Sequence, residues 1–219
     1  MATKTSATTG VQRCLTEIRQ MIISGDLLPG QKVHQGEIAE VLNVSRIPVR
    51  EALSTLQAEG VLTYKANTGF TVSRFSGEDL AEIYLMRRLL ETEILRSIDL
   101  STVDVDELEA LNEKLSALSS SDNPDEYQDT NHEFHFRLFA YSDLHLVTQE
   151  VQRLWYMSSF YRSLYIQAAD SRLRVYEEHI QMMDAIRNGD IEALIEISNE
   201  HRRSTEALVT QRIGFSRPR

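Results

Sequence analysis

Residues 44–53 read VSRIPVREAL, and this stretch decides the fold of the N-terminal part of the chain. Ser45 is a preferred helix N-cap residue, and Pro48 falls in the first helical turn, where proline is tolerated. The pattern therefore predicts a helix that begins at Ser45 and ends at Gly60, a residue type that commonly terminates helices. Its buried face is expected to comprise Ala52, Leu53 and Leu56.

Two helical patterns and a hairpin pattern surround this helix. Apolar residues at helical spacing over 11–22 and 38–42 predict the first two helices, and Asn43-Val44 predicts a tight turn before the third. Alternating residues beyond the third helix predict two strands, at 61–64 and 70–73, with a hairpin tip at 66–69. This order is a winged helix-turn-helix over residues 10–75, and residues 1–9 are expected to be a disordered tail.

Residues 76–219 are predicted to form an all-helical domain, because no strand pattern follows Arg74. Residues 76–79, Ser-Gly-Glu-Asp, are typical of a capping box that opens a long helix to about Leu100. Further helices are expected at 104–119, 125–142, 144–167, 171–188 and 190–213. The expected fold class is therefore mainly α: an N-terminal winged helix-turn-helix and a C-terminal antiparallel bundle of six helices.

Charge is distributed unevenly between these two parts of the 219-residue chain, whose net charge is −10. Residues 1–77 carry 8 Lys/Arg and 6 Asp/Glu, whereas residues 78–219 carry 15 and 27. The first part can therefore approach DNA although the whole chain is acidic. Its excess of +2 is small, so DNA affinity must come from a few well-placed arginines and from dimerisation.

The composition also predicts where the protein works. No apolar run approaches the roughly 18 residues needed to span a bilayer, and the N-terminus lacks the apolar core of a signal peptide. Cys14, the single cysteine, cannot form an internal disulfide and is expected to pack within the first helix. These features predict a soluble protein of the reducing cytoplasm.

Two arginines on the third helix are candidates for reading DNA. Arg46 and Arg50 stand four residues apart, so both project from one helix face. Arginine binds guanine through O6 and N7 or clamps a phosphate, and the first-turn amides at Ser45 can hold a phosphate. Gly69 lets the wing backbone approach DNA, and Lys65 adds a phosphate contact. The alternative is that both arginines are simply solvated.

The stretch 44–53, with residues 56–62 after it, closely resembles the recognition-helix signature of the bacterial GntR family of transcription regulators. Residues 22–30, IISGDLLPG, resemble the helix-to-turn signature of that family, so the resemblance covers residues 11–74. It implies contacts to double-stranded operator DNA from Arg46 and Arg50. The full candidate DNA site comprises Ser45, Arg46, Pro48, Arg50, Lys65 and Gly69.

Two departures from the family pattern concern basic residues. Residues 35–39, QGEIA, are acidic where relatives often carry a DNA-contacting arginine. Asn67-Thr68 precede Gly69, where the wing is commonly basic. Both departures imply fewer phosphate contacts than is usual in the family.

Three histidines of the helical domain are predicted to point inward. Asn131 and His135 stand four residues apart on one helix face, and His179 and His201 lie in register with apolar stripes on two other helices. Helical bundles build metal sites from facing side chains in this way, and neutral imidazole binds Zn, Ni, Cu and Fe. The alternative for any one of them is a hydrogen-bonded core histidine.

Residues 131–138, NHEFHFRL, are similar to the Asp/Asn-x-x-Phe-His signature of the FadR-type (FCD) ligand-binding domain, and residues 178–179 and His201 match its later histidines. This resemblance covers about residues 78–219, and six helices fit its VanR-like branch. It implies a divalent metal ion, Zn or Ni, held by Asn131, His135, His179 and His201. Asn131 stands where many relatives have aspartate, and a neutral amide binds a cation more weakly. A site with bound water and no metal is the alternative.

Arg87 and Glu91 stand four residues apart on the apolar stripe of the first bundle helix, so both point partly inward. Two interpretations remain open, since a buried arginine must be paired. Either the two form a salt bridge along the helix, or Arg87 binds the carboxylate of a small organic acid while the metal takes another oxygen. The resemblance favours a ligand-responsive homodimer on a palindromic operator, most often a repressor, in which the acid shifts the two DNA-binding heads.

Other functions fit less well. The stretch 132–135, HEFH, does not match a zincin motif, because its histidines are three residues apart rather than four. His132 and His145 are expected to face solvent, and the aromatic residues of 155–161 to pack in the core or at a dimer interface. The sequence predicts that the chain is not an enzyme. A helical domain used only for dimerisation, without metal or effector, is the remaining alternative.

Overall fold

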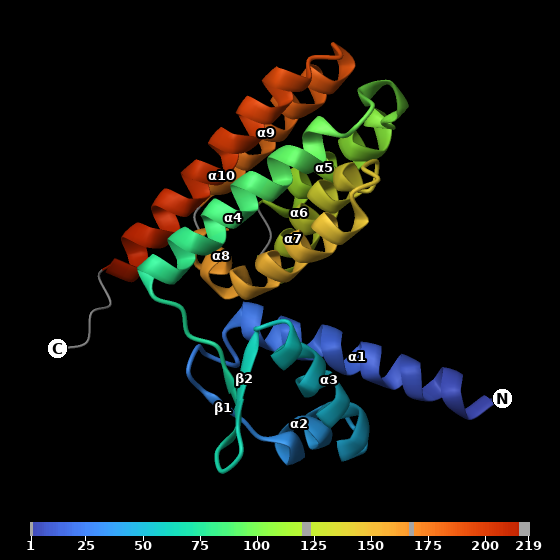
Figure 1. The fold of residues 1–219 in the computed structure, drawn as a ribbon, viewed down its shortest axis with the longest axis vertical. Coiled ribbons are helices and arrows are strands. Elements are labelled where there is room, and N and C mark those ends of the chain that lie inside the picture. The colour runs from blue at the N-terminus through green and yellow to red at the C-terminus, as the bar shows by residue number, and fades with distance from the viewer. Residues whose placement is uncertain (1, 120–123, 167–168, 215–219) are drawn as a thin grey trace. The chain divides into compact units, whose positions relative to one another are not determined.

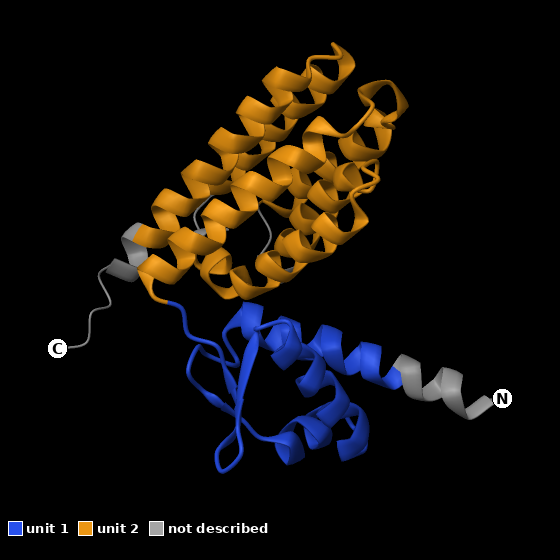
Figure 2. Cartoon of the chain, viewed as in Figure 1, with its two compact units in different colours: residues 1–75 blue, residues 76–219 orange. Residues whose placement is uncertain are grey.

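A computed structural model describes the backbone of residues 2–119, 124–166 and 169–214, and the side chains of 10–119, 126–164 and 171–210. The chain divides into two compact units, residues 1–75 and 76–219, which Figure 2 draws in different colours. Within the described residues no helix is both long and apolar enough to cross a membrane.

The first unit combines three helices with a small sheet, which confirms the predicted winged helix-turn-helix (Figure 1). The helices are α1 (Ala2–Ser24), α2 (Gln35–Val41) and α3 (Arg46–Ala58). The antiparallel strands are β1 (Lys32–Val33), β2 (Leu62–Lys65) and β3 (Gly69–Val72), in the order β1-β3-β2. The sequence did not predict β1, because two residues show no alternation. The predicted tail, residues 1–9, lies outside the residues whose side chains are described, and α1 is assigned from Ala2.

The helix-turn-helix is held by its turn residues and its buried face. Asn43 takes a left-handed conformation (φ 51°) between α2 and α3, and Gly60 does so (φ 79°) after α3. The fully buried residues of α3 are Val49, Ala52, Leu53 and Leu56. Ser45 occupies the predicted N-cap position with an extended backbone, but its side chain makes no capping hydrogen bond, so that part of the prediction is wrong. The hydroxyl is therefore available to a ligand.

The second unit is all-helical. Its helices are α4 (Gly77–Arg96), α5 (Val105–Leu118), α6 (Pro124–Phe139), α7 (His145–Met157), α8 (Ser159–Ile166), α9 (Ala169–Arg187) and α10 (Ile191–Gly214), with a 3-10 turn at Leu100–Thr102. The predicted capping box opens α4: Ser76 Oγ accepts from the Asp79 amide at 3.1 Å, and Asp79 Oδ2 accepts from the Ser76 amide at 2.8 Å. The helix ends at Arg96, four residues before its predicted end near Leu100.

The prediction of one continuous helix over residues 144–167 is wrong. The segment forms α7 and α8, so the described residues of this unit contain seven α-helices where six were expected. Arg162 Nη1 donates to the Trp155 carbonyl at 2.8 Å, and so satisfies an acceptor that the break at Ser158 leaves without a helical partner. No glycine or proline marks the break, and for that reason the sequence pattern runs through it.

The core of the second unit positions a polar cluster. Helix α4 packs against α7 and α10, and α9 packs against α5 and α10. Buried apolar residues from several of these helices form one cluster that includes Phe134, Leu138, Trp155, Met182 and Leu194. Histidines from α6, α9 and α10 and arginines from α4, α8 and α10 are buried within the same unit. Burying polar and charged side chains is costly, so this cluster is the candidate functional site of the second unit.

Candidate functional site

Three of the four predicted metal ligands meet in the core of the second unit. His135 from α6, His179 from α9 and His201 from α10 each offer a ligand atom, and these atoms lie within 4.8 Å of one another. His179 Nε2 lies 3.3 Å from His135 Nε2. All three side chains are buried, and Phe134 stacks on the His179 ring with centroids 3.8 Å apart. The imidazoles are therefore held in place by packing.

Two further side chains set the orientation of these rings. Asn112 Oδ1 lies 3.1 Å from His179 Nδ1, and Asn112 Nδ2 donates to the Tyr176 carbonyl, so the amide oxygen accepts from the histidine. Glu178 Oε2 lies 2.6 Å from His201 Nδ1. In both histidines Nδ1 then carries the proton, and the lone pair stands on Nε2. Metal-binding histidines commonly donate their second nitrogen to a carboxylate or carbonyl oxygen in this manner.

Two of the three buried histidines, His135 and His179, have a pKa lowered by burial and are neutral at neutral pH. Burial lowers the pKa of His135 well below its ordinary value, and His201 and Arg87 lower it further. Burial likewise lowers the pKa of His179, with added effects of His135 and His201. Neutral imidazole is the form that binds a metal ion, so both groups are in the state a cation requires.

Asn131, the fourth predicted ligand, lies one turn before His135 on α6 and is 5% exposed. Its Oδ1 is buried and has no hydrogen-bond partner among the described residues. A buried oxygen without a donor is costly, and a cation would satisfy it. Three imidazole nitrogens with an amide oxygen are a donor set that fits a divalent transition ion.

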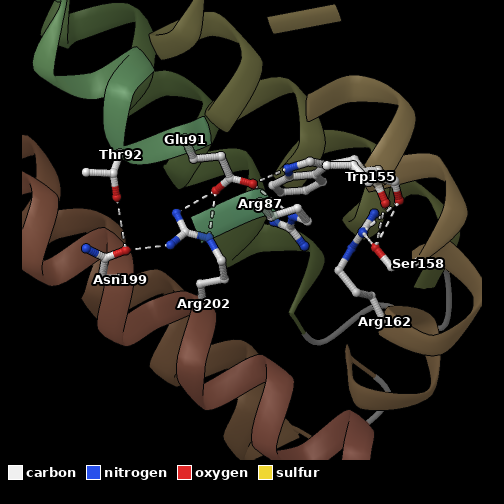
Figure 3. A network of polar contacts seen from close by, with 9 residues as sticks. Arg87, Glu91, Thr92, Trp155, Ser158, Arg162, Asn199 and Arg202 are labelled. Carbon is white, nitrogen blue, oxygen red and sulfur yellow. Dashed lines mark hydrogen bonds and ion pairs between the residues drawn. The ribbon is translucent and has the colours of Figure 1, made fainter. Parts of the chain in front are cut away.

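A network of buried charges, drawn in Figure 3, shares the wall of one cavity with His135 and His201. Glu91 accepts from Arg87 Nε at 2.8 Å and from Trp155 Nε1 at 2.9 Å through Oε1, and from Arg202 Nε and Nη2 at 2.9 and 2.6 Å through Oε2. Burial alone would raise the pKa of Glu91, but Arg202 and then Arg87 outweigh it and lower the pKa to about 2. Glu91 is therefore a carboxylate that ties α4 to α7 and α10.

The salt bridge along the helix, one of the two interpretations of Arg87 and Glu91, is present in the structure. The sequence analysis missed Arg202, which is 111 residues from Glu91 along the chain and donates to the same carboxylate. It also missed Arg162, which donates to the Ser158 hydroxyl at 2.7 Å and lies over the Trp155 ring. The sequence pattern did not predict that either arginine is buried. Arg202 belongs to the run HRR, which is typical of a solvent-exposed helix face, and Arg162 follows the helix break that the pattern does not indicate.

Two small cavities adjoin the network and share Arg87, Trp155 and Arg202 in their walls. They hold about 20 Å³ and about 10 Å³, which is room for single water molecules. The larger is lined by Tyr84, Arg87, Asn131, Trp155, Arg162, Val175, His201, Arg202 and Thr205. The histidines, the predicted amide ligand and the buried arginines thus belong to one continuous polar interior.

The remaining histidines behave as follows. His145 is exposed, as predicted. His132 does not face solvent as predicted: its ring is half-buried and stacks on Phe136 and Tyr156 with centroids 4.2 and 5.7 Å apart. Its position three residues from His135 places it on another side of α6 from the triad, beside the aromatic residues of α7.

The candidate DNA residues lie on the surface of the first unit. Arg46 and Arg50 are exposed on α3, and the Arg46 guanidinium lies beside Gly36 of α2, 3.4 Å from where a Cβ would stand. Pro48, in the first turn of α3, is half-buried. Ile47, which sequence reasoning did not single out, is 70% exposed on α3. Single exposed apolar residues are common on protein surfaces, so Ile47 is of interest only for its place between the two candidate arginines in the sequence.

The wing brings its two candidate residues to one end. Lys65 and Gly69 stand opposite each other in the β2–β3 pair, at the hairpin tip. Gly69 has φ 85°, which residues other than glycine rarely adopt. Because glycine has no Cβ, a ligand can approach the backbone closely at this position. Lys32 of β1 reaches the same place, with its Cε 4.0 Å from the position of a Gly69 Cβ. It supplies a cation that sequence reasoning overlooked.

A winged helix-turn-helix joined to a helical unit with this polar interior defines a DNA-binding transcription regulator. Residues 11–72 match the family described as bacterial regulatory proteins, gntR family, and residues 82–204 match the FCD domain. The chain therefore belongs to the GntR family of transcription regulators and carries an FCD domain.

Relatives and solved structures agree with this assignment. The chain is 31% identical to the Nta operon transcriptional regulator of Aminobacter aminovorans over 74% of its own length and 76% of the relative. It is 25% identical to the transcriptional repressor GlaR of Escherichia coli (strain K12), over 84% and 88%. The structure of E. coli McbR/YncC has the same fold, with a TM-score of 0.83, 22% identity and coverage of 93% and 98%. These proteins are regulators, and the prediction that the chain is not an enzyme is confirmed.

Proposed function

We propose that this regulator binds a palindromic operator as a cytoplasmic homodimer, and that its FCD domain holds one divalent metal ion, Zn or Ni, and a small organic acid that alters operator affinity. The observation that carries the proposal is the convergence of three buried histidines, together with Asn131, which shares a cavity wall with His201 and whose Oδ1 has no hydrogen-bond partner among the described residues. A purely structural core has no need of such a donor set, because apolar residues of similar volume stabilise a core at least as well.

The DNA contacts follow from the exposed face of α3 and the hairpin tip. Arg46 and Arg50 read guanines or bind phosphates, and Ile47 offers an apolar surface to a thymine methyl group. Lys65 and the bare backbone at Gly69 contact a phosphate or the minor groove. Repression is the expected output, because the similar protein GlaR is named a repressor.

His135, His179 and His201 would hold the metal through ring nitrogens, with Asn131 as an oxygen ligand. When bound, the ion supplies open positions for an oxygen donor such as a carboxylate. Glu178 and Asn112 keep the rings in the tautomer that presents Nε2. Arg87, whose Nη1 has no partner among the described residues, faces the same interior and receives the acid, with Glu91 fixing its position.

The DNA assignment predicts that Arg46→Ala and Arg50→Ala each weaken operator binding by about 1–3 kcal/mol, because each removes a base or phosphate contact. An operator selected from random-sequence DNA, followed by fluorescence anisotropy, measures the effect. Arg203→Ala, at an exposed arginine of α10 paired with Glu200, is the matched control and should bind as wild type. Full affinity in both α3 variants would contradict the assignment.

The metal assignment predicts that Asn131→Asp binds the divalent ion about tenfold or more tightly, because a charged oxygen replaces a neutral one within a few ångströms of the cation. Asn131→Ala should bind it more weakly than wild type. Competition with a chromogenic chelator gives all three affinities. Equal affinity in the three proteins would remove Asn131 from the ligand set and leave the histidines as the site.

A further inference from the structure

Four buried polar atoms that line the larger cavity have no hydrogen-bond partner within the described part of the chain. They are Tyr84 Oη, Arg87 Nη1, Asn131 Oδ1 and Arg162 Nε. Buried polar groups are nearly always paired, so a group of four around one cavity indicates that a ligand supplies the missing partners. Two of the four are guanidinium donors and a third is a hydroxyl, so a ligand that pairs with these three must present acceptors, whereas Asn131 Oδ1 is an acceptor and suits the proposed cation.

The charges around this interior do not balance. Its walls contain three buried arginines, Arg87, Arg162 and Arg202, and one carboxylate, Glu91. Both Glu91 oxygens are already engaged by Arg87 and Arg202. The arginine and glutamate side chains of the walls therefore carry a surplus of two positive charges.

Of these three arginines, Arg162 is the one that forms no ion pair with any side chain the structure describes. Its hydrogen bonds go to the Trp155 carbonyl and the Ser158 hydroxyl, and its guanidinium lies 4.4 Å from the Trp155 ring centre. Burial and then the nearby Arg87 lower the pKa of Arg162 to about 9, so it remains charged at neutral pH. Leaving a buried cation unpaired is costly, and proteins accept such a cost mainly where a ligand offsets it.

We propose that the effector is a dicarboxylate, and that Arg162, with Tyr84 Oη and the free Nη1 of Arg87, binds one of its carboxylate groups. This inference rests on the proposed effector function. It makes Arg162 the main carboxylate-binding residue, because Arg87 is already paired with Glu91. Two negative charges equal the surplus of the arginine and glutamate side chains, and the proposed divalent ion would add further positive charge for an acid to offset. The second carboxylate lies toward Asn131 and His201, which line the same cavity.

The larger cavity is too small for the proposed ligand. Its volume of about 20 Å³ admits a water molecule and not a dicarboxylate. Binding must therefore move apart the elements that carry the anchors, namely α4 (Tyr84, Arg87), α8 (Arg162) and α10 (Arg202). A ligand that binds only the opened arrangement shifts the population toward it, and an effector requires this difference in affinity.

The test uses the full-length protein and measures binding by calorimetry and thermal unfolding in malonate, succinate and glutarate. Propionate, which has one carboxylate, and succinamide, which has none, are the control compounds. At least one dicarboxylate should bind wild type and raise its melting temperature more than either control compound. Arg162→Met should bind that acid at least tenfold more weakly. Without acid its melting temperature should stay above that of Arg202→Met, because removing an unpaired buried charge offsets the loss of the hydrogen bonds to the Trp155 carbonyl and the Ser158 hydroxyl.

Two other arginine variants separate binding from folding. Arg202→Met should lower the melting temperature, because it removes a partner of Glu91. Arg172→Met should keep the acid response, because Arg172 is buried outside the cavity and donates to the carbonyls of residues 118 and 119. Unchanged acid affinity in Arg162→Met, or a loss of melting temperature like that of Arg202→Met, overturns the assignment of Arg162 alone. Absence of any dicarboxylate response in wild type overturns the dicarboxylate assignment, whereas a response to propionate alone would leave the organic-acid effector standing.

Discussion

Glu91→Gln is expected to lower the free energy of unfolding by about 3–5 kcal/mol, which is the usual cost of removing one partner from a buried ion network. The glutamine keeps the size of the side chain and loses its charge, so Arg87 and Arg202 stay buried without their carboxylate. Trp155 Nε1 keeps an acceptor, and the effect therefore reports the charge. Urea unfolding followed by circular dichroism measures it.

Glu93→Gln, two residues further along α4, is the matched control. Glu93 pairs with Arg96 at the surface, with both side chains at least half exposed, and an exposed pair contributes about 1 kcal/mol or less. The pH profile adds a check. The pKa of Glu91 is lowered to about 2 in the folded chain, so its stabilising effect is complete above the ordinary value of 4.5 and is lost as the pH falls toward 2. Equal stability of the two glutamine variants would contradict the structure of the network.

His179→Ala is expected to weaken binding of the divalent ion by more than about 100-fold, since losing a ligand costs more than losing an outer hydrogen bond, which costs about 10–100-fold. Among the proposed ligands, His179 has a fully buried ring, and its Nε2 lies 3.3 Å from His135 Nε2. Elemental analysis of protein purified without a chelator or affinity tag should find close to one ion per wild-type chain and none in the variant.

His145→Ala provides the control, because His145 is an exposed histidine of α7. Glu178→Gln gives an intermediate case, with metal affinity about 10–100-fold below wild type, because it weakens the acceptor that orients His201. Metal retained equally by His135→Ala, His179→Ala and His201→Ala would show that the three histidines do not form the site.

The sequence by itself determined the elements whose signals are local. The turn at Asn43, the helix end at Gly60 and the capping box at Ser76 each depend on residues within a few positions of one another, and the structure has all three. Helical spacing also placed His135, His179 and His201 on inward faces, because burial of a helix residue follows from its register with the apolar stripe. The resemblance to a known family then identified the domains that the comparisons confirm.

Tertiary structure decided which inward side chains meet. Glu91 is shared between Arg87, its neighbour on α4, and Arg202, which comes from α10, and periodicity predicts a face and not a partner across helices. The break at Ser158 is stabilised by a hydrogen bond from Arg162 to the Trp155 carbonyl, a contact no propensity encodes. The packing of the helices therefore decides which buried arginines form ion pairs. Arg87 pairs with Glu91, whereas Arg162 has no ion-pair partner in the part of the chain whose side chains are described. Contacts between helices depend on relative positions that only the assembled core sets.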